Sequence, residues 1–343
     1  MFLKKAAAPL AVGLPLVLGG ALLAPPAHAD TSPPAESSPP EVKRIAGQTR
    51  YETAAEISKA WDPADVDYVF IATGQAFPDA LAAGSIAGSY GQPLLLAKQD
   101  EIPPATQEAL ERLDPETIVL VGGPAAISEQ VETQLEEIAK VEREFGATRY
   151  ETAIELSKGA FDRSFDGLGT VLVADGRDFP DALSAGSLYA GTFGPLLLSG
   201  PEGLDDAALD EIERITPDFA RILGGEAAVP GNVEGQLEDI DILPVRTGGV
   251  DRWETSLMLA SLDYPVEEDE IEAVYFVTGH NYPDGLAVGP LASTQYGPVL
   301  LSHDACVTPD IADYVTALAP KNIYLVGGTG AVPDSVGELK VCS

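Results

Sequence analysis

The chain has 343 residues, of which 54 are acidic and 20 are basic, so its formal net charge at pH 7 is −34. A surface this negative repels a phosphate backbone, which excludes nucleic acid as the main partner. After residue 29 no stretch reaches the 18 or more apolar residues of a membrane-spanning helix, so membrane insertion of the processed chain is also excluded. We expect the acidic side chains to lie on the surface in contact with water, where they keep the protein soluble; the alternative is that they bind divalent cations.

The first segment of the chain is typical of export. Residues 1–29 combine two lysines, an apolar run and the small-residue ending Ala27-His28-Ala29, which predicts a signal peptide. Residues 30–41 are rich in proline and serine and are predicted to form a disordered spacer. We therefore expect a secreted protein that no covalent anchor holds.

The rest of the chain contains three repeats, predicted as residues 42–140, 141–240 and 241–343. Each repeat carries an Arg-aromatic-Glu-Thr segment, an aromatic-Pro-Asp segment and a Gly-Gly pair, and the Asp always precedes the first glycine by 43 residues. Fixed spacing indicates one folded module repeated three times. The copies are Arg50-Tyr-Glu-Thr, Arg149-Tyr-Glu-Thr and Arg252-Trp-Glu-Thr; Phe77-Pro-Asp, Phe179-Pro-Asp and Tyr282-Pro-Asp; Gly122-Gly123, Gly224-Gly225 and Gly327-Gly328.

Apolar strands alternate with helices inside each repeat. Near-continuous apolar strands separated by helices of about ten residues indicate a parallel sheet that is covered on both faces. The sequence therefore predicts an α/β fold of three tandem Rossmann-like modules with parallel sheets. In the first repeat the predicted strands are 42–46, 66–72, 93–97 and 117–121, and the predicted helices are 50–60, 78–89, 104–113 and 128–139.

The Arg-aromatic-Glu-Thr segment begins a helix. Thr49 and Glu52 form a predicted capping box, as do Thr148 with Glu151 and Asp251 with Glu254, which gives the glutamates a structural role. The arginines are harder to explain, because a cation in the first helical turn opposes the helix dipole. Either each arginine pairs with an acidic residue across the module, or it binds an anionic ligand through its bidentate guanidinium group. These arginines are Arg50, Arg149 and Arg252.

The aspartates of the second motif follow a strand and begin a helix, where α/β folds place ligands. Their simplest role is to complement the helix dipole. The alternative is that each pairs with a repeated arginine, at a seam between modules or in the wall of a groove. The Gly-Gly pair predicts a tight turn; it lacks the G-x-G-x-x-G order and a Walker lysine, so no nucleotide cofactor is expected. The aspartates are Asp79, Asp181 and Asp284.

Cysteines and histidines of the processed chain are confined to the third repeat. Cys306 and Cys342 are expected to form a disulfide, since a metal site needs more ligands than two thiols. His280 corresponds to Gln75 and Arg177 in the other copies, so it is not a repeated feature. We therefore predict no catalytic residues and no metal site.

Taken together with the strands Pro93-Leu-Leu-Leu, Pro195-Leu-Leu-Leu and Pro298-Val-Leu-Leu, these motifs resemble the type 2 cell-wall-binding repeat family of Gram-positive bacteria. The resemblance implies a pseudo-threefold body at the cell surface that binds an anionic wall polymer non-covalently. The apolar Pro-Leu-Leu-Leu strands are then expected to set the packing of the modules. The candidate polymer-binding residues are the three arginines and three aspartates named above.

Two functions remain open from the sequence. In the first, the protein is a non-catalytic wall-binding protein, and local basic pockets or bridging divalent cations overcome its negative field. In the second, it is a wall-modifying hydrolase whose site lies in the divergent third repeat. That repeat has Trp253, Ser256, Gly285 and Val299 where the other copies have different residues.

Overall fold

A computed structural model describes residues 39–76, 78–161, 169–178, 180–186, 188, 193–266, 271–280 and 284–342. The predicted signal peptide and residues 30–38 of the predicted spacer lie outside the described residues, as do Phe77, Phe179 and Tyr282 of the second motif. Glu41, the last residue of the predicted spacer, is the first residue of a strand.

Each repeat folds into the same alternation of strands and helices. The first contains β1 (Glu41–Ile45), α1 (Arg50–Ser58), the 3₁₀ helix η1 (Pro63–Asp65), β2 (Tyr68–Thr73), α2 (Pro78–Ser89), β3 (Leu94–Ala97), α3 (Pro104–Leu113), β4 (Thr117–Val121) and α4 (Glu129–Glu136). The second contains β5 (Lys140–Glu144), α5 (Arg149–Ala160), β6 (Thr170–Asp175), α6 (Pro180–Ala185), β7 (Phe193–Ser199), α7 (Asp206–Ile215), β8 (Phe219–Leu223) and α8 (Asn232–Glu238). The third contains β9 (Leu243–Thr247), α9 (Arg252–Asp263), β10 (Ala273–Thr278), α10 (Val288–Thr294), β11 (Val299–Ser302), α11 (Pro309–Leu318), β12 (Asn322–Val326) and α12 (Asp334–Gly337). Among the helices described, none is both long and apolar enough to cross a membrane.

The strands form three four-stranded parallel sheets, in the orders β3-β2-β4-β5, β7-β6-β8-β9 and β1-β12-β10-β11. The first strand of each repeat does not join the sheet of its own repeat. Instead β5 pairs with β4 and β9 pairs with β8, each completing the sheet of the preceding repeat. In the same way β1 pairs with β12 and completes the sheet of the third repeat. The three modules are therefore closed into a ring by the strand at the start of the fold.

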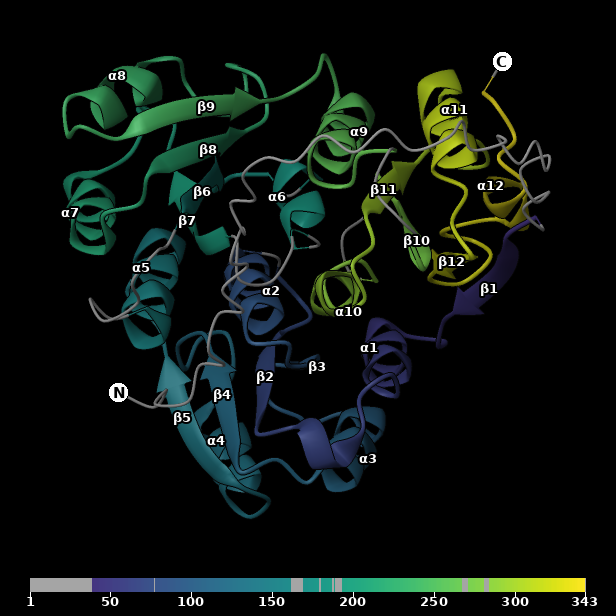
Figure 1. The fold of residues 1–343 in the computed structure, drawn as a ribbon. Coiled ribbons are helices and arrows are strands. Elements are labelled where there is room, and N and C mark those ends of the chain that lie inside the picture. Colours follow the sequence, from purple (N-terminus) through teal and green to yellow (C-terminus); the bar gives the residue numbers. More distant parts are fainter. Residues whose placement is uncertain are drawn as a thin grey trace, which may run out of the picture.

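The ring has pseudo-threefold symmetry, and helices α2, α6 and α10 meet at its centre (Figure 1). The close approach of the central helices depends on glycines. A Cβ atom on Gly289 would lie 2.9 Å from the backbone of Gly186, closer than packed atoms tolerate. The predicted α/β fold of three Rossmann-like modules in a pseudo-threefold arrangement is thus confirmed.

The helix that begins each repeat connects two modules. Helices α1, α5 and α9 pack on the edge strands β3, β7 and β11 of their own repeats, and on the central helices α10, α2 and α6 of the preceding repeats. The edge strands are the Pro-Leu-Leu-Leu segments, and Leu94, Leu95 and Leu96 are at most 1% exposed. Burial of this kind agrees with the expected packing role of these strands.

The C-terminal end of the third module is held by a disulfide. Cys306, in the loop after β11, is bonded to Cys342, and the two Cα atoms are 5.1 Å apart. Beside this bridge, α12 packs on β12, and Gly337 lies against Val42 of β1. The disulfide therefore braces the region in which the first strand joins the last sheet.

Candidate functional site

Three seams join the modules, and the repeated motifs meet at each of them. We name each seam by the repeats that it joins. At seam 1/2 helix α5 meets α2, at seam 2/3 helix α9 meets α6, and at seam 3/1 helix α1 meets α10. Seams 1/2 and 2/3 join consecutive repeats, whereas seam 3/1 joins the last repeat to the first.

The helix that begins each repeat has the predicted N-cap residue, and the complete predicted capping box forms at α1. The side chains of Thr49, Thr148 and Asp251 accept a hydrogen bond from the backbone N–H of the glutamate three residues later. The glutamates reach back in turn: Glu151 accepts from the N–H of Ala147 at 2.7 Å. The glutamates therefore serve the helix ends, and the positions of the neighbouring arginines are fixed by them.

Each repeated arginine is also tied to the loop after the second strand of its own repeat. Nη1 of Arg149 donates to the carbonyl of Gly176 at 2.7 Å, and Nη1 of Arg252 donates to that of Gly279 at 2.7 Å. Arg50 makes the equivalent bond to Gly74. The aromatic residue after each arginine packs on the same glycine. Arginine and aromatic ring together hold this loop at the seam.

Across each seam the arginine faces the repeated aspartate of the preceding repeat. Burial raises the pKa of Asp284, whereas a hydrogen bond from Thr53 and the charge of Arg50 lower it. The pKa of Asp79 is likewise raised by burial and lowered by Arg149 and Thr152, and that of Asp181 is raised by burial and lowered by Thr255 and Arg252. The structure thus brings the six predicted site residues together as three Arg–Asp sets, each shared by two repeats.

The first glycine of each Gly-Gly pair makes room for the aspartate. Gly122, Gly224 and Gly327 have φ angles of 110°, 95° and 112°, a region that residues with side chains rarely adopt. A Cβ atom at these positions would lie 3.1, 2.2 and 2.9 Å from Oδ2 of the aspartate in the same repeat. The constant spacing of 43 residues between aspartate and glycine follows from this contact.

A second set of repeated arginines was missed by the sequence reasoning. Nη1 of Arg44, Arg143 and Arg246, on strands β1, β5 and β9, donates to the carbonyl of the first glycine in the neighbouring Gly-Gly turn at 2.7, 2.7 and 2.9 Å. Each lies six residues before the arginine of the helix, and this constant spacing is the signal that could have identified the set. Their contacts are with the protein itself, so they lock each joining strand onto the turn of the preceding repeat.

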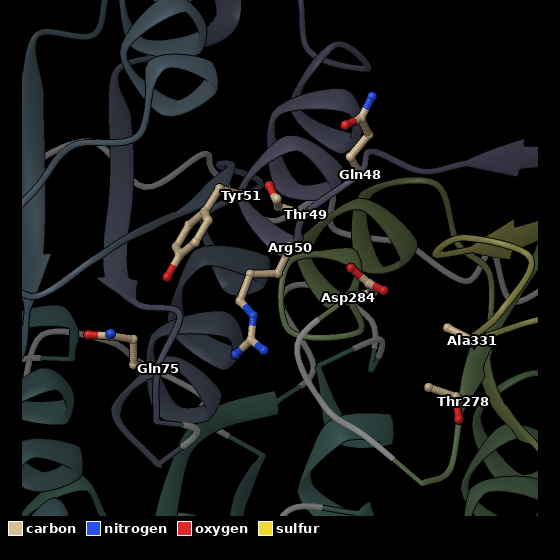
Figure 2. A pocket seen from close by; sticks show the side chains of 8 residues that line it. All are labelled: Gln48, Thr49, Arg50, Tyr51, Gln75, Thr278, Asp284 and Ala331. Atoms are coloured by element: carbon tan, nitrogen blue, oxygen red, sulfur yellow. The ribbon is translucent and has the colours of Figure 1, made fainter.

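Among the described residues, cavities adjoin the repeated arginine at seams 3/1 and 2/3. Seam 3/1 has a cavity of about 620 Å³, and seam 2/3 has one of about 290 Å³. Figure 2 shows the side chain of Arg50 extending into the first cavity, between Gln75 on one side and Asp284 and Thr278 on the other. The first cavity is lined by Gln48, Thr49, Arg50, Tyr51, Gln75, Thr278, Asp284 and Ala331.

The third repeat gathers both histidines of the fold around Trp253. The His303 ring stacks on Trp253 with centroids 3.7 Å apart, and Nε2 of His280 lies 3.3 Å from Oδ1 of Asp304. Half of the His280 side chain and most of the Asp304 side chain are exposed. Within the described ranges there is no group of three or more histidine, cysteine, aspartate or glutamate residues that could hold a metal ion.

The sequence matches the Cell wall binding domain 2 (CWB2) family in three successive segments, residues 44–132, 143–234 and 246–337. These segments cover most of the chain, with one segment in each of the three repeats. The chain therefore belongs to the CWB2 family. Membership identifies it as a secreted, cell-wall-binding protein of the cell wall or cell surface.

Similar proteins agree with this assignment. The N-acetylmuramoyl-L-alanine amidase LytC of Bacillus subtilis is 25% identical over 87% of this chain and 57% of its own length. The Amidase enhancer of the same organism is 27% identical over 85% of this chain and 39% of its own length. Among solved structures, Cwp6 and Cwp8 from Clostridium difficile are similar, with TM-scores of 0.77 and 0.76 and identities of 26% and 25%. They are matched over 88% and 87% of this chain, and over 47% and 51% of their own chains, so this chain spans about half the length of these relatives.

Proposed function

We propose that the protein binds an anionic polymer of the cell wall without catalysing a reaction on it, and that the repeated arginines at the seams contact the polymer. The observation that carries this proposal is that Arg50 and Arg252 each line an open cavity at a seam. A guanidinium group offers a planar, bidentate donor to a phosphate or carboxylate group.

The negative charge of the protein makes such local sites necessary. With a net charge of −34, the surface as a whole repels an anionic polymer. An arginine in a concave seam attracts a nearby anion more strongly than an exposed lysine does, because low-dielectric walls strengthen nearby interactions. The aspartate across each seam offsets part of the charge of the arginine.

Replacing the three arginines together tests the proposal. We expect Arg50→Gln, Arg149→Gln and Arg252→Gln, combined in one chain, to lower the affinity for isolated cell walls at least about tenfold, because charge-assisted hydrogen bonds are lost. Co-sedimentation with purified walls measures the affinity, and circular dichroism shows whether the variant is folded. The matched control removes three exposed cations that are not among the residues lining the seam cavities, by Lys59→Gln, Lys140→Gln and Lys158→Gln.

Two further sedimentation experiments test whether the ligand is the anionic polymer and whether divalent cations bridge it to the protein. Removal of the anionic polymer from the walls should abolish sedimentation; if stripped walls retain the protein equally well, the polymer is not its ligand. Addition of a chelator should leave sedimentation unchanged, because the proposed contacts are direct. Release by the chelator would instead identify bridging divalent cations, and loss of binding in the lysine control would show that net charge alone decides.

The His280–Asp304 pair in the third repeat is a structural feature in favour of the hydrolase alternative. A histidine beside a carboxylate can act as a general base. Incubation of the protein with labelled wall fragments tests this role, and release of label that His280→Gln abolishes would establish it. We expect no release.

A further inference from the structure

The three seams share their repeated residues but differ in charge. Eight described residues line the cavity at seam 3/1, and Arg50 and Asp284 are the charged ones among them. The others include the amide and hydroxyl side chains of Gln48, Gln75 and Thr278, which hydrogen-bond sugar hydroxyl groups readily. Beside this cavity, the ammonium group of Lys98 lies 5.9 Å from the ring centroid of Tyr51.

Seam 2/3 carries more negative charge around its arginine. Nη2 of Arg252 lies 3.7 Å from Oδ2 of Asp178, so a carboxylate already competes for the group that an anionic ligand would contact. Asp175 and Asp178 occupy the positions of Thr278 and Asn281 in the third repeat, and Asp251 occupies that of Thr49 in the first. The carboxylates that line this cavity are Asp175, Asp178, Asp181 and Asp251.

At seam 1/2 an aromatic side chain covers part of the Gly-Gly turn. Phe145 stands where the first repeat has Ala46 and the third has Gly248. Its ring covers the second glycine of the Gly-Gly turn, so that a Cβ atom on Gly123 would lie 2.9 Å from the ring. The equivalent glycine at seam 2/3, Gly225, lines the open cavity there. A polymer segment at seam 1/2 would have to displace this ring.

From these differences we infer that seam 3/1 is the principal site for the anionic polymer, and that seams 1/2 and 2/3 mainly hold the ring together. This inference rests on the proposed function. At seam 3/1 Arg50 receives the anionic group, and the amide and hydroxyl groups around it receive the sugar or polyol unit that carries this group. At seam 2/3 the extra carboxylates repel the same ligand.

The experiment uses three single variants, each of which adds one negative charge to one seam at an equivalent, exposed position. Gln48, Ala147 and Val250 precede the helix cap in the three repeats, and all three are exposed. We expect Gln48→Glu to weaken binding to isolated walls roughly fivefold, because the new carboxylate lies beside the bound anion. Ala147→Glu and Val250→Glu make the same change in net charge and should leave the affinity within about twofold.

Several outcomes would overturn the inference. If the three variants weaken binding equally, the seams share the polymer and only the proposed function stands. If none weakens binding, although removal of the polymer from the wall does, the site lies outside the cavities. If the unaltered protein sediments equally with stripped walls, the proposed function itself fails.

A reciprocal variant tests the charge argument by gain of binding. Asp178→Asn gives seam 2/3 the residue that the third repeat has at the equivalent position, Asn281. Removal of the carboxylate beside Arg252 should strengthen wall binding about twofold, as a second seam becomes able to accept the polymer. An unchanged or weaker affinity would contradict the view that carboxylates close this seam. The thermal unfolding of each variant checks that the ring is intact.

Discussion

Seams 1/2 and 3/1 use the same contacts but are closed in different ways. At seam 1/2 the bond from Arg143 to Gly122 spans 21 residues of chain, whereas at seam 3/1 the equivalent bond from Arg44 to Gly327 spans 283. Taken alone, closing the longer loop costs about 2 kcal/mol more in chain entropy. Repeated residues therefore make the same contacts at both seams, but the contacts at seam 3/1 depend more on the rest of the ring, which must bring the two ends of the chain together.

Loss of the disulfide should have the largest effect on seam 3/1 relative to the other two seams, because the disulfide braces the third module beside β1. Replacing both cysteines, by Cys306→Ser and Cys342→Ser, opens a loop with a sequence separation of 36 residues. We expect a loss of about 4 kcal/mol in the free energy of unfolding, measured by urea titration. Amide hydrogen exchange should show the loss of protection mainly in β1 and β12.

Reduction of the unaltered protein is the control, and it should reproduce the result of the double substitution. If the amides of β5 and β9 lose protection as much as those of β1, the disulfide stabilises the whole ring equally. The distinction between the closing seam and the other two would then be wrong.

The Gly-Gly turns allow a second comparison of the seams. Gly122→Ala, Gly224→Ala and Gly327→Ala each force a side chain into a left-handed conformation and against an aspartate. We expect each to lower the free energy of unfolding by about 2 kcal/mol, from backbone strain and the displaced carboxylate. Hydrogen exchange should show that Gly327→Ala also releases β1, since no short connection holds that strand to β12.

A matched control lies in the same turn. A Cβ atom on Gly328 would meet no atom within 4 Å, and its φ angle is not in the left-handed region. Gly328→Ala should therefore leave stability nearly unchanged. Equal destabilisation by Gly327→Ala and Gly328→Ala would show that the turn needs general flexibility, and that the contact with Asp284 is unimportant.

Much of this architecture could be predicted from local patterns. Helices 78–89 and 104–113 and the strand 117–121 were predicted with the bounds that the structure has, because each depends on periodicity and on its own end signals. Thr49 and Glu52 were recognised as a cap for the same reason. Local patterns were sufficient wherever the interaction itself is local.

The pairings between repeats could not be obtained in that way. The strand at 41–45 has the same pattern whichever sheet it joins, so nothing local shows that it pairs with 322–326. Likewise, the spacing of Arg50 and Asp79 within a repeat does not reveal that Arg50 faces Asp284 of another repeat. The sequence indicated which residues recur, but the choice between a pair within one repeat and a pair across a seam depends on tertiary packing.

The pH dependence of stability should give the smallest effect, and it tests the seams together. Burial raises the pKa of Asp79, Asp181 and Asp284 above the ordinary value of about 4, so between that value and the raised one the folded protein binds more protons than the unfolded chain. Stability, measured by urea titrations, is therefore expected to fall as pH rises above the ordinary carboxyl value and through the raised pKa values. The combined variant Asp79→Asn, Asp181→Asn and Asp284→Asn should flatten this slope, since the three repeated aspartates then no longer titrate. If the slope survives unchanged, it arises from the general negative charge of the surface, and the buried seam carboxylates do not control it.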